Sequence, residues 1–230
     1  MDPGFITIEQ KEEEILTIDK YQSLVGALLY VAVCTRPDLV IHGRKVSKPT
    51  ARDWMEAKRA LRYLKGIAGL KLRLGGRGNL EGYADADWAC DRTDRKSNSG
   101  FLFKLGEGVI SWTARKQQCV TLSSTEAEYV ALAEATKELL WLLKLMRGLG
   151  EDIQQPVTVY EDNQSCISML SAEGVTRRTK HIDTRYNFVR DFYGSGVLNI
   201  VYCPSEEMLA DALTKPPGRI KLQKIREEIG

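Results

Sequence analysis

This sequence of 230 residues shows no membrane-spanning apolar run, no pattern of a secretory signal and no cysteine pairs of a structural zinc site. No apolar run approaches the length needed to span a membrane, and residues 1–14 are polar and acidic, unlike a secretory signal. The five cysteines are scattered, odd in number and without a Cys-x-x-Cys pair, which argues against structural zinc and indicates reduced thiols. These absences predict an intracellular protein, in the cytoplasm or nucleus, with no membrane partner.

The apolar content of 43% is enough for one ordinary core with an appendage. The N-terminal segment is rich in glutamate and poor in apolar residues, so we expect it to be flexible. Helical periodicity then predicts a helix over 21–35 and a second helix that Thr50 caps and Gly66 ends. The expected organisation is a flexible segment at 1–20, a helical segment at 21–78, a main domain at 79–217 and a basic tail helix at 218–230.

The near-neutral net charge of +2 hides a local imbalance. Between residues 41 and 80, eleven basic residues stand against Asp53 and Glu56, a local net charge of +9. A basic block of this kind can be a solvated helix face, but this density of basic residues favours a polyanion-binding surface.

The stretch 80–88 reads LEGYADADW and alternates like a strand, with Asp85 and Asp87 on one face. Two carboxylates on one strand face repel each other if both are desolvated and unpaired. A divalent cation would turn that repulsion into attraction. The alternative for this stretch alone is a strand that ends in a solvated acidic turn.

Three further acidic residues stand in places where a carboxylate is costly without a partner. A long helix over 124–149 has an apolar stripe that, extended backwards, reaches Glu128, whereas Glu126 falls on the opposite side. Asp162 follows an apolar strand and precedes a helix, the usual place for sites in α/β sheets. Asp211 lies in an apolar helix that we expect Ser205 to cap.

The predicted order is three antiparallel strands, helix, strand, helix, helix, strand, helix, which is an α/β fold. The strands are expected over 80–88, 99–105, 109–113, 156–160 and 197–203. Four carboxylates that converge at one edge of a mixed sheet can hold two Mg²⁺ ions about 4 Å apart, with Mn²⁺ as a possible substitute. Such a site hydrolyses phosphodiesters without a His, Cys or Lys nucleophile.

This arrangement resembles ribonuclease H, and seven motifs in order resemble the copia-type branch of retrotransposon Pol polyproteins. The motifs are GYADADWA (82–89), SGF (99–101), ISW (110–112), LSSTEAEY (122–129), EDNQ (161–164), TKHID (179–183) and LADALTKP (209–216). Residues 21–26 and 62–66 resemble the segment that joins reverse transcriptase to ribonuclease H. The resemblance implies a ribonuclease H-like mixed five-stranded sheet flanked by helices, preceded by a small helical segment from the reverse-transcriptase tail.

Residue by residue, the resemblance implies Asp85, Glu128, Asp162 and Asp211 as the metal-binding and catalytic quartet. It favours Asp85 over Asp87, and together with the helical pattern Glu128 over Glu126. Polar groups near the first helix and beside the fourth strand read the 2′-hydroxyls of RNA in that family. The positions that match here are Ser124, Thr125 and Gln164, and contacts with phosphate are expected from Arg177, Arg178, Lys180 and His181.

Several departures from the family keep a second interpretation open. No Tyr-x-Asp-Asp polymerase motif, protease, integrase or zinc knuckle is present, and the stretch between Asp38 and Thr50 is shorter than usual. The chain is expected to be at most the tail of a Pol polyprotein. The leading hypothesis is a magnesium-dependent endonuclease that cleaves the RNA strand of RNA–DNA hybrids. The alternative is a catalytically inactive, nucleic-acid-binding remnant; an integrase or resolvase relative fits the order of elements less well.

Overall fold

The computed structural model describes residues 18–39, 49–91, 93–171 and 183–229. Within these ranges the chain forms two compact units. The smaller unit includes residues 18–30 and 49–68, and the larger one includes residues 31–39 and everything described from residue 69 onward. None of the helices in the described ranges is long and apolar enough to cross a membrane.

The smaller unit contains most of α1 (Ile18–Cys34) and all of α2 (Ala51–Gly66). Thr50 caps α2 through a reciprocal pair of hydrogen bonds, because its hydroxyl accepts from the Asp53 amide and the Asp53 carboxylate accepts from the Thr50 amide. The rings of Tyr21 and Trp54 meet edge to face, with centroids 6.4 Å apart. The predicted cap at Thr50 and the predicted end of the helix at Gly66 are both confirmed.

The larger unit is built on a mixed sheet of five strands in the order β3-β2-β1-β4-β5. The first three strands pair antiparallel in sequence, whereas β4 runs parallel to β1 and β5 parallel to β4. This arrangement confirms the predicted meander and the mixed α/β fold. The strands are β1 (Leu80–Asp87), β2 (Asn98–Leu105), β3 (Gly108–Lys116), β4 (Val157–Glu161) and β5 (Leu198–Tyr202).

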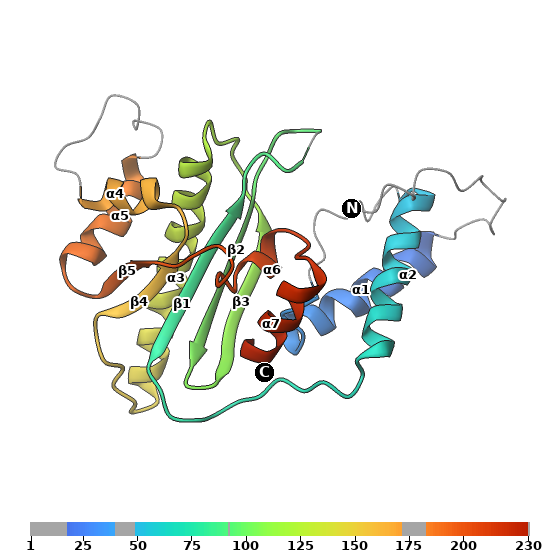
Figure 1. Cartoon of the computed structure of the whole chain (residues 1–230), viewed down its shortest axis with the longest axis horizontal. Helices are drawn as coiled ribbons and strands as arrows, with labels where there is room; N and C mark the ends of the chain where they lie inside the picture. The colour runs from blue at the N-terminus through green and yellow to red at the C-terminus, as the bar shows by residue number, and fades with distance from the viewer. Residues whose placement is uncertain (1–17, 40–48, 92, 172–182, 230) are drawn as a thin grey trace. The chain divides into compact units, whose positions relative to one another are not determined.

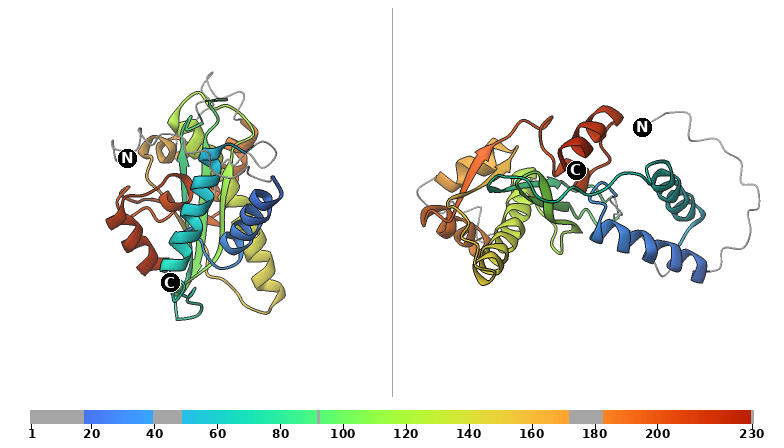
Figure 2. Two further views of the ribbon diagram at one scale, coloured as in Figure 1. Left: turned by 90° about the vertical axis from the view of Figure 1, so that its right-hand side faces the viewer. Right: turned by 90° about the horizontal axis from the view of Figure 1, so that it is seen from below.

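Helices cover both faces of this sheet, as Figures 1 and 2 show. Phe101 and Phe103 of β2 point into the core beneath the long helix α3, whereas the intervening Leu102 points to the opposite face and packs with α6 and α7. This alternation is what the two-residue period of a strand requires. The helices of this unit are α3 (Ser124–Gly148), α4 (Gln164–Ser171), α5 (Asp183–Gly194), α6 (Asp211–Thr214) and α7 (Arg219–Ile229).

The C-terminal helix α7 packs on the sheet instead of extending from it as a tail. Its Ile225 and Ile229 are buried in one cluster with Leu102 of β2, Val109 of β3 and Leu213 of α6. The same compact unit contains α7 and the sheet. The boundary expected after residue 217 therefore lies inside a shared apolar cluster.

The predicted start of a helix at Ser205 is wrong. Residues 205–207 form a turn, and α6 begins only at Asp211. The apolar side chains that suggested a longer helix pack separately, because Met208 joins Cys203 and Ala210, whereas Leu209 joins the cluster beneath α7. Asp211 is thus the first residue of its helix.

Candidate metal and nuclease site

Strand β1 delivers Asp85 to the face of the sheet opposite α3. Its neighbours Ala84 and Ala86 pack toward α3, so the side chain between them points away from that helix. The carboxylate is buried, with 1% of the residue exposed, and one oxygen accepts a hydrogen bond from the hydroxyl of Thr214. Asp87, which shares the face, is only partly buried, and it does not belong to the carboxylate group described below.

Helix α3 supplies Glu128 from its first turns. Ser123 caps the helix by accepting a hydrogen bond from the Glu126 amide, and the Glu126 carboxylate accepts one from the Leu122 amide at 2.7 Å. Glu126 is therefore used in capping, whereas Glu128 is buried with 6% of its surface exposed. Of the two glutamates, the structure brings Glu128 to the other carboxylates.

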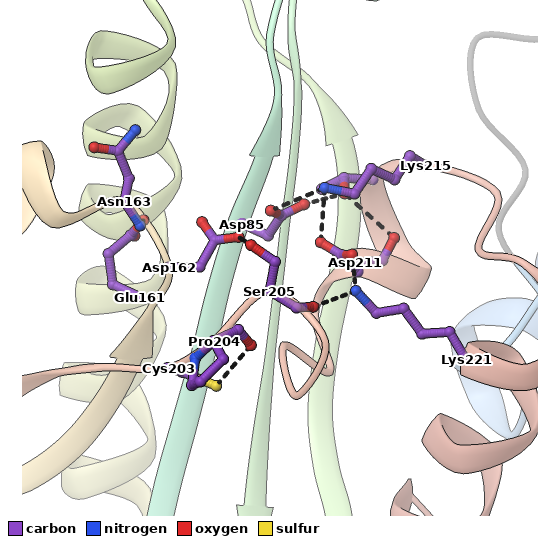
Figure 3. Close-up of polar contacts among 11 residues, drawn as sticks. Asp85, Glu161, Asp162, Asn163, Cys203, Pro204, Ser205, Asp211, Lys215 and Lys221 are labelled. Carbon is purple, nitrogen blue, oxygen red and sulfur yellow. Dashed lines mark hydrogen bonds and ion pairs between the residues drawn. The ribbon is translucent and has the colours of Figure 1, made fainter.

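Asp162 follows directly after β4, which lies parallel to β1, so the two strands place their acids at the same edge. The hydroxyl of Ser205 donates a hydrogen bond to Asp162 Oδ2 at 2.6 Å. Figure 3 shows Ser205 lying between Asp162 and the side chain of Lys221. This contact fixes the orientation of the Asp162 carboxylate.

Asp85, Glu128 and Asp162 each offer an oxygen, and these oxygens lie within 4.8 Å of one another. Opposite ligands of one Mg²⁺ ion are about 4 Å apart, so a small adjustment of side chains would close the group around a cation. Among the described residues, Glu128 Oε2 has no hydrogen-bond partner although it is buried. A buried, unpartnered carboxylate oxygen aimed at two other acids fits a divalent cation.

The raised pKa values of Asp85 and Glu128 show the cost of bringing these carboxylates together. Burial is the main cause that raises the pKa of Glu128 to about 11, and the nearby carboxylates of Glu161, Asp85 and Asp162 add to it. Burial also raises the pKa of Asp85 to about 7, against the opposing effect of Lys215. A hard cation would favour the ionised forms and remove this penalty.

Asp211 lies outside the group of three carboxylates and forms ion pairs with two lysines. Its Oδ1 lies 2.8 Å from the ammonium of Lys215, and its Oδ2 pairs with the ammonium of Lys221 from α7. The Lys215 ammonium also lies 3.6 Å from Asp85 Oδ1, so it links Asp211 to the group of three (Figure 3).

Two features of this site were missed in the sequence. The first is Glu161, which is fully buried at the end of β4, has one oxygen bonded to the Asn163 amide at 3.0 Å, and has its pKa raised well above the ordinary range by burial. Its alternation with Val157 and Val159 is the signal that could have placed it in the core. The second is the pair Lys215 and Lys221. Lys215 stands four residues after Asp211, a helical ion-pair spacing that could have signalled it, whereas nothing in the sequence near Asp211 signals Lys221.

The remaining predicted residues fall into two groups. Ser124 and Gln164 are exposed at the first positions of α3 and α4, and Thr125 beside Ser124 is partly buried. The predicted phosphate contacts lie outside the described residues: Arg177, Arg178, Lys180 and His181.

Comparisons with known proteins relate most of the chain to polyproteins of plant transposons. The chain is 41% identical over 215 residues to the Retrovirus-related Pol polyprotein from transposon TNT 1-94 of Nicotiana tabacum, covering 91% of this chain and 16% of that protein. It is 39% identical over 217 residues to the Retrovirus-related Pol polyprotein from transposon RE2 of Arabidopsis thaliana, covering 92% of this chain and 15% of that protein. The chain thus spans about one sixth of the length of these relatives.

Solved structures resemble a smaller part of the chain than these polyproteins do, and no family model matches it. Among solved structures, LC11-RNase H1 in complex with an RNA/DNA hybrid is similar with a TM-score of 0.44 and 18% identity, over 59% of this chain and 94% of that one.

Proposed function

The chain belongs to the Pol polyproteins of copia-type retrotransposons, and we propose that its larger unit is a divalent-metal-dependent nuclease that hydrolyses the RNA strand of RNA–DNA hybrids. The observation that carries this proposal is the convergence of Asp85, Glu128 and Asp162 from three separate elements. Burying Asp85 and Glu128 beside the partly buried Asp162 is unfavourable for folding alone. A divalent cation bound among these carboxylates would offset that cost, because it favours their ionised forms.

The chain's own residues would act by holding and orienting. Asp85, Glu128 and Asp162 would bind the cation, Asp211 would complete the quartet, and Thr214 and Ser205 would keep Asp85 and Asp162 in place. Bound Mg²⁺ would supply a lowered pKa for the attacking water and stabilise charge on the phosphate. No side-chain nucleophile is needed for this reaction.

The substrate side of the proposal rests on the surface around these carboxylates. Ser124, Thr125 and Gln164 lie at the starts of the helices α3 and α4 that flank the site, where amide and hydroxyl groups can meet the 2′-hydroxyls of RNA. We assign Arg177, Arg178, Lys180 and His181 to phosphate contacts on the basis of their sequence motif. Other segments of a Pol polyprotein are the proposed protein partners.

The experiment compares four labelled substrates of one sequence: an RNA–DNA hybrid, double-stranded DNA, double-stranded RNA and single-stranded RNA. With Mg²⁺ we expect cleavage of the RNA strand in the hybrid only, and EDTA should stop it. A hybrid left uncut at enzyme excess would overturn the proposed activity. Salt-sensitive binding without any product would then favour the inactive nucleic-acid-binding remnant.

A further inference from the structure

The carboxylate of Asp211 is already engaged by two positive charges of the chain itself. Lys215 follows α6 by one residue and reaches back to Asp211 Oδ1 at 2.8 Å, and it lies 3.6 Å from Asp85 Oδ1. Its ammonium therefore occupies the space between the two aspartates that a second divalent cation would have to share. Figure 3 shows this bridging position.

The second lysine comes from α7 and holds Asp211 from the other side. Lys221 pairs with Asp211 Oδ2 and donates to the backbone carbonyl of Ser205, the same residue whose hydroxyl binds Asp162. Its side chain is 22% exposed, compared with 41% for Lys215. Lys221 is thus the more buried of the two, and Lys215 is the more accessible to solvent.

A second divalent ion between Asp85 and Asp211 would lie next to the Lys215 ammonium, which is 3.6 Å from Asp85 Oδ1 and 2.8 Å from Asp211 Oδ1. Like charges a few ångströms apart repel strongly, so the ion and the ammonium compete for the same two carboxylates.

We infer that Lys215 is the second cation of the free protein: a single divalent ion binds among Asp85, Glu128 and Asp162, and the Lys215 ammonium excludes another from between Asp85 and Asp211. This inference rests on the proposed metal-dependent function. It assigns Lys215 the role of a positioning residue that keeps Asp85 and Asp211 together before substrate arrives. Lys221 keeps Asp211 turned toward Lys215.

The test counts Mn²⁺ ions bound to the full chain without nucleic acid, by titration calorimetry and by the electron paramagnetic resonance signal of free Mn²⁺. We expect one ion for the wild type. Lys215→Met should bind a second ion, at least about tenfold more tightly than the wild type binds any second ion. Lys215→Arg, which keeps the charge, should bind one ion like the wild type.

The matched control is Lys137→Met, which removes a lysine of α3 that pairs with Glu134 and with none of the carboxylates of the site. It should leave the count at one. Lys215→Gln provides a second neutral substitution if Lys215→Met does not fold, and it should admit the second ion in the same way. Thermal melts confirm that each variant is folded.

Two results overturn the inference alone: a wild type that already binds two Mn²⁺ ions, or a folded Lys215→Met that binds one ion with unchanged affinity. A wild type that binds no Mn²⁺ would instead overturn the proposed metal-dependent function together with the inference. The failures of the two proposals are therefore distinguishable.

Discussion

Glu126 and Glu128 are two residues apart on α3, yet one caps the helix and the other joins a buried group of acids. The Glu126 carboxylate accepts a hydrogen bond from the Leu122 amide, whereas Glu128 contributes an oxygen that lies within 4.8 Å of oxygens from Asp85 and Asp162. This division of roles makes the pair a matched test of the site.

Glu128→Gln is expected to abolish Mn²⁺ binding and hybrid cleavage, because an amide replaces an anionic ligand. The stability of the metal-free protein should change little, since the raised pKa of about 11 keeps Glu128 protonated near neutral pH. Glu126→Gln should keep both properties and lie within about 0.5 kcal/mol of the wild-type stability, because glutamine also serves in a helix cap. Calorimetry with Mn²⁺ and chemical denaturation measure both effects, and equal losses in the two variants would contradict the assignment.

Ser205→Ala removes the hydroxyl that donates to Asp162 Oδ2. Partners of metal ligands typically contribute about 10- to 100-fold in metal affinity, so we expect a loss of that order. Ser205 is exposed, so the fold should be unaffected. The measurement is the Mn²⁺ dissociation constant. An unchanged constant would show that Asp162 needs no such support.

The pH dependence of stability should reveal the unfavourable burial of Asp85. Its pKa is raised from 3.8 to about 7, so the folded protein without metal holds a proton that the unfolded chain releases near pH 4. That contribution to stability is complete below about pH 4 and is lost as the pH rises through about 7. Bound Mg²⁺ favours the ionised carboxylate, so the rise in melting temperature caused by Mg²⁺ should be larger at pH 8 than at pH 5.

Melting curves in EDTA and in excess Mg²⁺ at the two pH values check this expectation. The same coupling predicts that Mn²⁺ binding near pH 6 releases protons. Calorimetry in buffers of different ionisation enthalpy counts them. A metal-induced shift that is equal at both pH values would contradict the buried, protonated Asp85.

Ile225→Ala tests whether α7 is an integral part of the larger unit. Ile225 is buried in the cluster with Leu102 and Leu213, so its truncation should cost about 2–5 kcal/mol of unfolding free energy. Ile220 on the same helix is 87% exposed, and Ile220→Ala should stay within about 0.5 kcal/mol of the wild type. Urea denaturation compares them; equal small effects would mean that α7 is a dispensable tail.

Most strands and helices could be predicted from the sequence because each has a hydrophobic period of its own. The alternation of Leu80 to Asp87 and the apolar stripe of α3 predict which way Asp85 and Glu128 point, without reference to tertiary contacts. Thr50 and Gly66 marked the ends of α2 by local chemistry alone. These features depend on neighbours within a few residues, so a single sequence contains them.

What escaped prediction depends on contacts between distant segments. Ser205 looked like a helix cap, but its hydroxyl is used by Asp162, 43 residues away, and the helix starts at Asp211 instead. Lys221 joins the site only because α7 packs back on the sheet through Ile225 and Ile229. No periodicity within a segment encodes such tertiary hydrogen bonds and ion pairs.

Cleavage of an end-labelled RNA–DNA hybrid by the wild type and by Asp85→Asn, at enzyme excess with Mg²⁺, tests the central claim most directly. Losing a cation worth several kcal/mol of transition-state stabilisation corresponds to a rate loss of about 10³-fold or more. We predict that loss for Asp85→Asn, and near wild-type cleavage for Asp87→Asn, which alters the neighbouring acid outside the group of three. Equal cleavage by wild type and Asp85→Asn, or none by the wild type, would contradict the account.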